Sequence, residues 1–184
     1  MSNRIDTLFE RLREEGKKAF VAYVAAGDPD LSRCKTVVRA LEAAGADLIE
    51  LGVPFSDPLA DGIVNQMAAQ RALDAGTTTA RVIEMIRQLR EEGLQAPIVL
   101  FTYLNPIYTY GFEQFHRDAS AAGADGILSL DMPPDEATAH RELDYHEGLK
   151  QIRLIAPTSS KERIASIAMA SEGFIYYVSR EGVT

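Results

Sequence analysis

Residues 43–62 have the sequence AAGADLIELGVPFSDPLADG, in which a short apolar stretch stands between the end of one helix and the start of another. The helical pattern stops at Gly45, the run DLIELGV at 47–53 predicts a strand, and a loop with two prolines follows. The pentapeptide AAGAD recurs at 121–125, again between a predicted helix and a predicted strand. Helices and strands that alternate in this way indicate a parallel sheet covered by helices.

The same alternation extends along the chain in both directions. Predicted strands occupy residues 19–27, 47–53, 97–105, 125–133, 149–157 and 174–184, the last of which runs into a loop. Predicted helices occupy residues 5–12, 31–45, 64–76, 78–93, 111–123, 135–148 and 160–173. Because no Pro-rich or Ser-rich linker interrupts this pattern, we expect residues 1–184 to form one domain.

Two architectures of the α/β class fit the pattern, an open doubly wound sheet and a (β/α)8 barrel. The pattern alone slightly favours the open sheet, since six strands are visible and a barrel usually needs about 250 residues. No GxGxxG or GxxxxGK[ST] motif follows a strand, which removes the main support for a nucleotide-binding protein. In either architecture, ligands bind at the carboxyl ends of the strands.

Composition narrows the class of protein. The chain has 184 residues and a net charge of −8, and an acidic chain without a basic stripe argues against nucleic acid as the partner. It has no apolar run of the roughly 18 residues that a membrane span needs, and no apolar core of a signal peptide near its start. The single cysteine, Cys34, cannot form an internal disulfide and fits a reducing compartment, so we expect a cytoplasmic protein.

The apolar strand at 47–53 carries an unexpected acid, Glu50, near its carboxyl end. Because side chains alternate along a strand, Glu50 shares a face with Leu48 and Gly52. A carboxylate on the inner face of a barrel is partly desolvated, which favours its neutral form and suits it to proton transfer near neutral pH. The alternative is an ion pair with a lysine or arginine of a neighbouring strand, and the strand alone does not decide between the two.

The loop after this strand brings a second acid, Asp61, into consideration. Pro54 and Pro58 restrict the loop, so it is stiff and can fold Asp61 back over the same strand end. Taken alone, Asp61 is better interpreted as the N-cap of the following helix. Asp57 has a similar structural interpretation as a turn residue before Pro58.

The segment ELGVPFSDPLADG at 50–62 strongly resembles the signature of the tryptophan synthase alpha subunit family. The resemblance continues in FVAYVAAGDP (20–29), FTYLNPI (101–107), DGILSLDMPPDEA (125–137) and YYVSREGVT (176–184). It implies a (β/α)8 TIM barrel and a carbon–carbon lyase of tryptophan biosynthesis, which cleaves indole-3-glycerol phosphate to indole and glyceraldehyde 3-phosphate. It also implies that the N-terminal helix and about six βα units are present, with two more units beyond residue 184.

The resemblance assigns roles to individual residues. Glu50 matches the general acid/base that moves a proton at indole C3, and Asp61 matches the carboxylate that hydrogen-bonds the indole N–H and stabilises positive charge on the ring. Two carboxylates in different environments can divide this work. The substrate-binding residues that the resemblance implies are Tyr23, Phe101, Leu128, Tyr176 and Thr184. Tyr23, Phe101 and Leu128 are, taken singly, better explained as strand core.

The resemblance further implies a beta subunit that holds pyridoxal phosphate and receives indole, in an α2β2 assembly. This chain is expected to need no cofactor of its own. The candidate contacts with the partner are Asp57, Pro58, Asn105 and Asp131, the last within the segment 131–134. Thr184 would contact Asp61 when a mobile loop closes over the site. Two other functions stay open: a binding subunit that mainly activates its beta partner, and a stand-alone lyase that releases indole.

Two departures from the family pattern affect the pocket. Asn65 stands where an apolar residue commonly contacts the indole, so it changes either the packing or the hydrogen bonding there. The family's phosphate site is built mainly from the last two βα loops, so a protein that ended at residue 184 would bind substrate weakly and expose strand edges.

The remaining reactive side chains are predicted to be structural. His116, His140 and His146 form no cluster with acids or cysteines, so we expect no metal site and interpret them as solvent-facing helix residues. Cys34 has no apparent partner for nucleophilic catalysis and is predicted to pack in the core.

Overall fold

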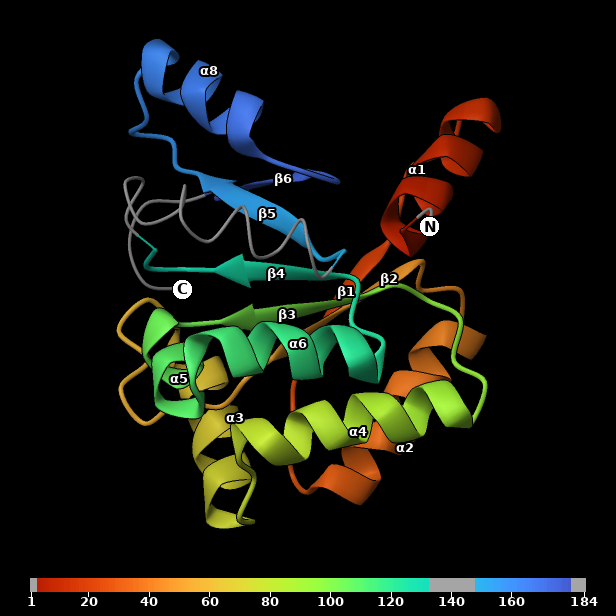
Figure 1. The fold of residues 1–184 in the computed structure, drawn as a ribbon, viewed down its shortest axis with the longest axis vertical. Coiled ribbons are helices and arrows are strands. Elements are labelled where there is room, and N and C mark those ends of the chain that lie inside the picture. The colour runs from red at the N-terminus through yellow and green to blue at the C-terminus, as the bar shows by residue number, and fades with distance from the viewer. Residues whose placement is uncertain (1–2, 133–147, 180–184) are drawn as a thin grey trace.

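The computed structural model describes residues 3–132 and 148–179, which form an N-terminal helix followed by alternating strands and helices (Figure 1). The strands are β1 (Val21–Ala25), β2 (Leu48–Gly52), β3 (Ile98–Thr102), β4 (Gly126–Ser129), β5 (Lys150–Ile155) and β6 (Ile175–Tyr177). The helices are α1 (Arg4–Glu14), α2 (Leu31–Ala43), α3 (Ile63–Asp74), α4 (Thr79–Glu91), α5 (Leu104–Tyr110), α6 (Phe112–Ala122) and α8 (Lys161–Ala170). The predicted alternation is therefore confirmed.

The strands form one parallel sheet in which sequence order and spatial order are the same, β1-β2-β3-β4-β5-β6. A doubly wound sheet reverses its strand order at a switch point, and no reversal occurs among the described strands. The order is that of a (β/α) barrel, so the open sheet that the pattern alone favours is wrong. The periodicity of a strand records that it is buried, but not which strand lies beside it.

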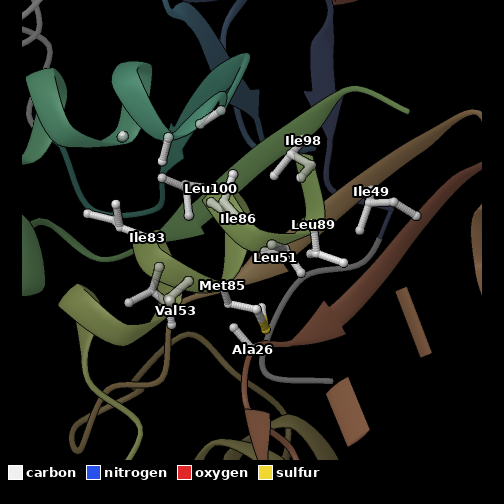
Figure 2. Close-up of a cluster of buried hydrophobic side chains, with 14 of the residues drawn as sticks. Ala26, Ile49, Leu51, Val53, Ile83, Met85, Ile86, Leu89, Ile98 and Leu100 are labelled. Carbon is white, nitrogen blue, oxygen red and sulfur yellow. The ribbon is translucent and has the colours of Figure 1, made fainter. Parts of the chain in front are cut away.

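The outer face of the sheet packs against helices α2, α4 and α6, and this layer holds the larger hydrophobic core. Figure 2 shows its centre, where two strands meet one face of α4. The strand side chains are Ile49 and Leu51 of β2 and Ile98 and Leu100 of β3, and the helix side chains are Ile83, Met85, Ile86 and Leu89. Burial of each such side chain contributes about 1.5–3 kcal/mol, so this layer fixes β2 and β3 beneath the site.

The inner face of the sheet carries a second, smaller cluster. Leu48, Val99, Leu128 and Ile152 come from four neighbouring strands, β2 to β5, and all four are buried. Ile5, Leu8 and Leu12 of α1 pack against them. Because α1 covers the amino-terminal part of this face, the inner residues nearer the carboxyl ends of the strands remain available for a site.

The repeated AAGAD segments, 43–47 and 121–125, have the same structural role. Each ends a helix and places an aspartate at the start of a strand. Asp47 accepts a hydrogen bond from the backbone N–H of Phe20 at 2.9 Å, and its own N–H donates to the Phe20 carbonyl oxygen. The aspartate thereby fixes where its strand begins relative to the preceding strand, as a stability feature at the amino-terminal end of the sheet.

The second aspartate of the repeat, Asp125, is the centre of a buried ionic network. It accepts from the backbone N–H of Ile98 at 2.8 Å and pairs with Arg90 at 2.7 Å and Arg4 at 3.0 Å. The side chain of Asp125 is 3% exposed and that of Arg90 10%. Removing only one partner of a pair this well buried is costly, because the remaining charge stays buried with neither its partner nor water to stabilise it.

The observed boundaries differ from the predicted ones mainly after β3. The predicted strand at 97–105 is too long, since β3 ends at Thr102 and α5 begins at Leu104. This short helix is not predicted from the sequence, although Pro106 stands in its first turn, where the lack of an N–H costs no hydrogen bond. β6 covers Ile175–Tyr177 of the predicted 174–184, of which residues 180–184 lie outside the described residues. Residues 135–147 of the helix predicted before β5 also lie outside them.

Candidate active site

Glu50 lies on the inner face of β2 and is the middle residue of that strand. All five residues of β2 are buried, and Glu50 is 4% exposed. Leu48 belongs to the inner cluster whereas Ile49 and Leu51 belong to the outer one, so the side chains alternate as predicted. Glu50 pairs in register with Tyr23 of β1 on one side and with β3 on the other. It therefore lies inside the curled sheet with neighbours from both adjacent strands.

The Glu50 carboxyl is buried without compensation. In the described part of the chain it has no ion pair, and its Oε1 has no hydrogen-bond partner. The alternative of a pairing with a lysine or arginine of a neighbouring strand is therefore not found among those residues. Burial raises the pKa of Glu50 from 4.5 to about 7. A carboxyl with this pKa exchanges its proton near neutral pH, which suits a general acid or base.

Asp61 stands at the end of the loop that follows β2, and it is not the N-cap of α3. The N-cap is Gly62, which has no side chain to cap with. Asp61 is half-buried, and its Oδ2 accepts a hydrogen bond from the Tyr103 hydroxyl at 3.0 Å. Burial raises the pKa of Asp61, while hydrogen bonds from Tyr103 and Asn65 act in the opposite direction. The predicted capping role is therefore wrong, because the carboxylate is turned toward Tyr103 instead.

Three aromatic rings cross the inner face beside Glu50. The centroids of Tyr23 and Phe101 are 5.4 Å apart, and those of Phe101 and Tyr176 are 6.0 Å apart, both edge to face. Burial, followed by the charge of Asp61 and then by other nearby groups including Glu50, raises the pKa of Tyr23. Tyr23 therefore lies close enough to both carboxylates for their charges to affect its pKa. The three rings thus form an aromatic row on the inner face of the sheet, with Tyr23 in register with Glu50.

The predicted pocket residues occupy different parts of this space. Leu128 is fully buried and pairs in register with Phe101, so it forms part of the inner core at the base of the aromatic rings. Phe101 and Tyr176 are half-buried, and Tyr23 is 38% exposed. Thr184 lies outside the described residues.

Gly52 makes room for the Tyr23 ring. It follows Glu50 on the same face of β2 and pairs in register with Phe101. A Cβ atom at this position would lie 2.2 Å from the Tyr23 hydroxyl oxygen and 2.6 Å from Cζ. Only glycine lets the ring cross the strand end in its present position, so the glycine after the acid is part of the site.

The residues predicted to face a partner lie at the same end of the sheet. Asp57 and Asn105 are exposed and Pro58 is half-buried. Asp131 has an internal bond, since its Oδ1 accepts from the backbone N–H of Leu104 at 2.7 Å at the start of α5. Residues 133–134 of the predicted segment lie outside the described ranges. Four large apolar side chains near Asp57 are also exposed, namely Leu59, Ile63, Val64 and Met67.

Tyr103 is the residue that sequence reasoning misses. Its hydroxyl accepts from the backbone N–H of Ala60 and donates to Asp61, both at 3.0 Å, and its ring lies 5.4 Å from that of Phe55. It directly follows β3. A side chain with a hydroxyl group at the carboxyl end of a barrel strand is a candidate site residue, and this position was the signal in the sequence that could have identified it.

The other reactive side chains do not join the site. His116 is 1% exposed, which makes the predicted solvent-facing position wrong, and its Nδ1 is 2.7 Å from the Phe112 carbonyl oxygen. Cys34 is buried in the outer core, as predicted. His140 and His146 lie outside the described residues. Within residues 3–132 and 148–179, no group of three or more His, Cys, Asp or Glu side chains is placed to hold a metal ion.

No helix among the described segments has the length and the apolar character that crossing a bilayer requires.

Known proteins resemble this chain over nearly its whole length. A family model described as "Tryptophan synthase alpha chain" matches residues 9–184. Proteins named tryptophan synthase alpha chain from Citrifermentans bemidjiense and Opitutus terrae are 52% and 48% identical to it over 182 residues, which is 99% of this chain and 68% of each relative.

Solved structures give the same result for the fold. The tryptophan synthase alpha subunit of Legionella pneumophila superposes with a TM-score of 0.93 at 41% identity, covering 97% of this chain and 68% of that one. A tryptophan synthase structure from Mycobacterium tuberculosis also gives a TM-score of 0.93, at 35% identity, covering 100% of this chain and 71% of that one.

Proposed function

Because the chain belongs to the tryptophan synthase alpha chain family, we propose that Glu50 and Asp61 carry the proton chemistry of that family's reaction. The reaction cleaves indole-3-glycerol phosphate to indole and glyceraldehyde 3-phosphate in tryptophan biosynthesis, and the protein is a carbon–carbon lyase of the TIM-barrel class. Glu50 lies in the middle of β2 and Asp61 in the loop after its carboxyl end, and TIM barrels bind their substrates at that end of the strands.

The observation that supports this proposal most is the contrast between the two carboxyl groups. Glu50 is buried with no partner for Oε1 in the described chain, and its pKa is raised to about 7. Burial also raises the pKa of Asp61, but the hydrogen bond that its carboxylate accepts from Tyr103 opposes that shift and favours the charged form, whereas no described residue opposes the shift of Glu50. One acid is thereby suited to exchanging a proton and the other to remaining an anion, as acid/base chemistry at one site requires.

Glu50 and Asp61 can share the steps of the cleavage, and Glu50 regains a proton in a later step in place of the one that it donates. Protonated Glu50 gives its proton to indole C3, and the Asp61 carboxylate accepts a hydrogen bond from the ring N–H, which stabilises the positive charge that forms. The resulting Glu50 carboxylate then takes the proton of the hydroxyl on the carbon attached to C3. That oxygen becomes the aldehyde carbonyl, the C–C bond breaks, and its electron pair restores the aromatic ring.

The aromatic rings would hold the indole between the acids. Tyr23, Phe101 and Tyr176 present ring faces and edges on the inner side of the sheet, and Leu128 closes its base. A flat apolar ring fits such a space and displaces water from it, which strengthens the interaction between the Asp61 carboxylate and the ring cation. Thr184 is proposed to join the site by contacting Asp61.

We also propose that a beta subunit binds at the carboxyl-terminal end of the sheet. Leu59, Ile63, Val64 and Met67 are exposed together with Asp57 and the adjoining loop. Apolar side chains that gather on one exposed surface are typical of interaction sites. Pro58, Asn105 and Asp131 are the further proposed contacts. Pyridoxal phosphate would belong to the partner, in an α2β2 complex in the cytoplasm.

The test is indole release from indole-3-glycerol phosphate by the complete protein, with and without the tryptophan synthase beta chain. We expect cleavage that the beta chain accelerates, and a loss of about 10²–10³ in kcat for Asp61→Asn. The matched control is Asp74→Asn at the far end of α3, which should keep wild-type turnover. If no indole is released under either condition, the remaining interpretation is a subunit that only activates its beta partner. If the rate of indole release is the same with and without the beta chain, the protein is a stand-alone lyase.

A further inference from the structure

A single side chain ties the Ala60–Asp61 segment to the end of β3. The hydroxyl of Tyr103 accepts the backbone N–H of Ala60 and donates to Asp61 Oδ2, each at 3.0 Å. Tyr103 is 6% exposed, and its ring packs 5.4 Å from that of Phe55 in the same loop. Packing therefore fixes the phenol, and its one donor is committed to Asp61.

The first turn of α3 holds Asp61 from the other side. Gln66 Nε2 donates a hydrogen bond to the Asp61 carbonyl oxygen at 2.8 Å. Gly62 is the N-cap and has no side chain to use, so the Gln66 side chain reaches back to the residue before it. The positive end of the helix also favours an anion here.

We propose that Tyr103 is a positioning residue, which holds the Asp61 carboxylate in the orientation that a ligand N–H requires while Gln66 fixes the Asp61 backbone. The inference rests on the proposed role of Asp61 and adds the groups that prepare it. Glu50 has no comparable donor on its Oε1, which is consistent with a group that must gain and lose a proton.

Two variants test the proposal in the complete protein, assayed with its beta chain. In Tyr103→Phe the Asp61 carboxylate loses its donor, and in Gln66→Leu the Asp61 backbone loses the bond that holds it, so we expect kcat to fall about 10- to 100-fold while KM changes by less than about threefold. Loss of a bond to the charged form raises the pKa of Asp61, so the acid limb of the kcat profile of Tyr103→Phe should move to higher pH. Tyr110→Phe is the matched control, because its hydroxyl donates to Asp118 at 2.6 Å away from the site.

The outcomes separate this inference from the proposed function. If Asp61→Asn is inactive but both donor variants keep the wild-type kcat and pH profile, the positioning role is overturned and the function stands. If Asp61→Asn turns over normally, the role of Asp61 itself is wrong. Activity that falls only in step with thermal stability, with an unmoved pH profile, would make Tyr103 purely structural. Should Tyr103→Phe fold poorly, Gln66→Leu at the half-buried Gln66 still gives the kcat readout.

Discussion

Replacement of Glu50 by glutamine should stabilise the protein above neutral pH. The pKa of Glu50 is about 7 in the folded chain and 4.5 ordinarily. Below the lower value the group is protonated in both states and costs nothing. Between the two values only the unfolded chain releases the proton, so the free energy of unfolding falls as pH rises. Above the upper value the loss is complete, at about 3 kcal/mol for a shift of this size. Glutamine has no charge to desolvate and avoids this loss.

Urea unfolding of the wild type and of Glu50→Gln, from about pH 5 to about pH 8, measures the effect. The two proteins should differ little at the acid end, and the variant should gain up to about 3 kcal/mol at the alkaline end. Glu113→Gln is the control, because that side chain is 75% exposed and its replacement should change stability by less than about 0.5 kcal/mol. A stability difference that is absent, or that is the same at both ends, would refute uncompensated burial of Glu50.

Three further perturbations test other parts of the structure. Asp125→Ala leaves the Arg90 guanidinium buried without its carboxylate and should cost about 3–5 kcal/mol in urea unfolding; a loss below about 1 kcal/mol would mean that solvent reaches Arg90. Gly52→Ala drives a methyl group into the Tyr23 ring and should lower kcat while costing about 1–3 kcal/mol of stability; wild-type turnover would show that the ring position is unimportant. Met67→Asp should weaken beta-chain binding, measured by calorimetry, by about tenfold or more; unchanged affinity would remove α3 from the interface.

The sequence predicts the strands and their parallel direction, because both follow from local periodicity and the alternation of strands and helices. Alternation along the strand only allows the inward position of Glu50, and the family resemblance supplies that choice. The pattern does not distinguish a curled sheet from an open one, since the neighbour of a strand is decided by packing between distant segments. The buried position of His116 could have been found. It lies one turn after Phe112 and next to Phe115 on the apolar face of α6.

The residues of the candidate site also differ in whether the sequence alone could identify them. Glu50 is recognisable because it interrupts an apolar strand, whereas Asp61 taken alone is interpreted as a helix cap and gains its catalytic role only from the family resemblance. Tyr103 is not recognisable, because its two partners, Asp61 and Ala60, are 42 and 43 residues away in the sequence. The bond of Gln66 to the Asp61 carbonyl oxygen depends on which residue becomes the N-cap of α3, and the sequence suggests Asp61 rather than Gly62. Side-chain direction at a helix start is set by that choice.

Indole release by Glu50→Gln tests the central claim most directly. The measurement is single-turnover cleavage of indole-3-glycerol phosphate near pH 7 by the complete protein with its beta chain, compared with the wild type. Glutamine keeps the shape of the side chain but can neither give a proton to C3 nor take one from the hydroxyl, so the rate should fall by at least about 10²–10⁴. A variant that folds and cleaves the substrate at close to the wild-type rate would contradict the assignment of Glu50 as the proton carrier.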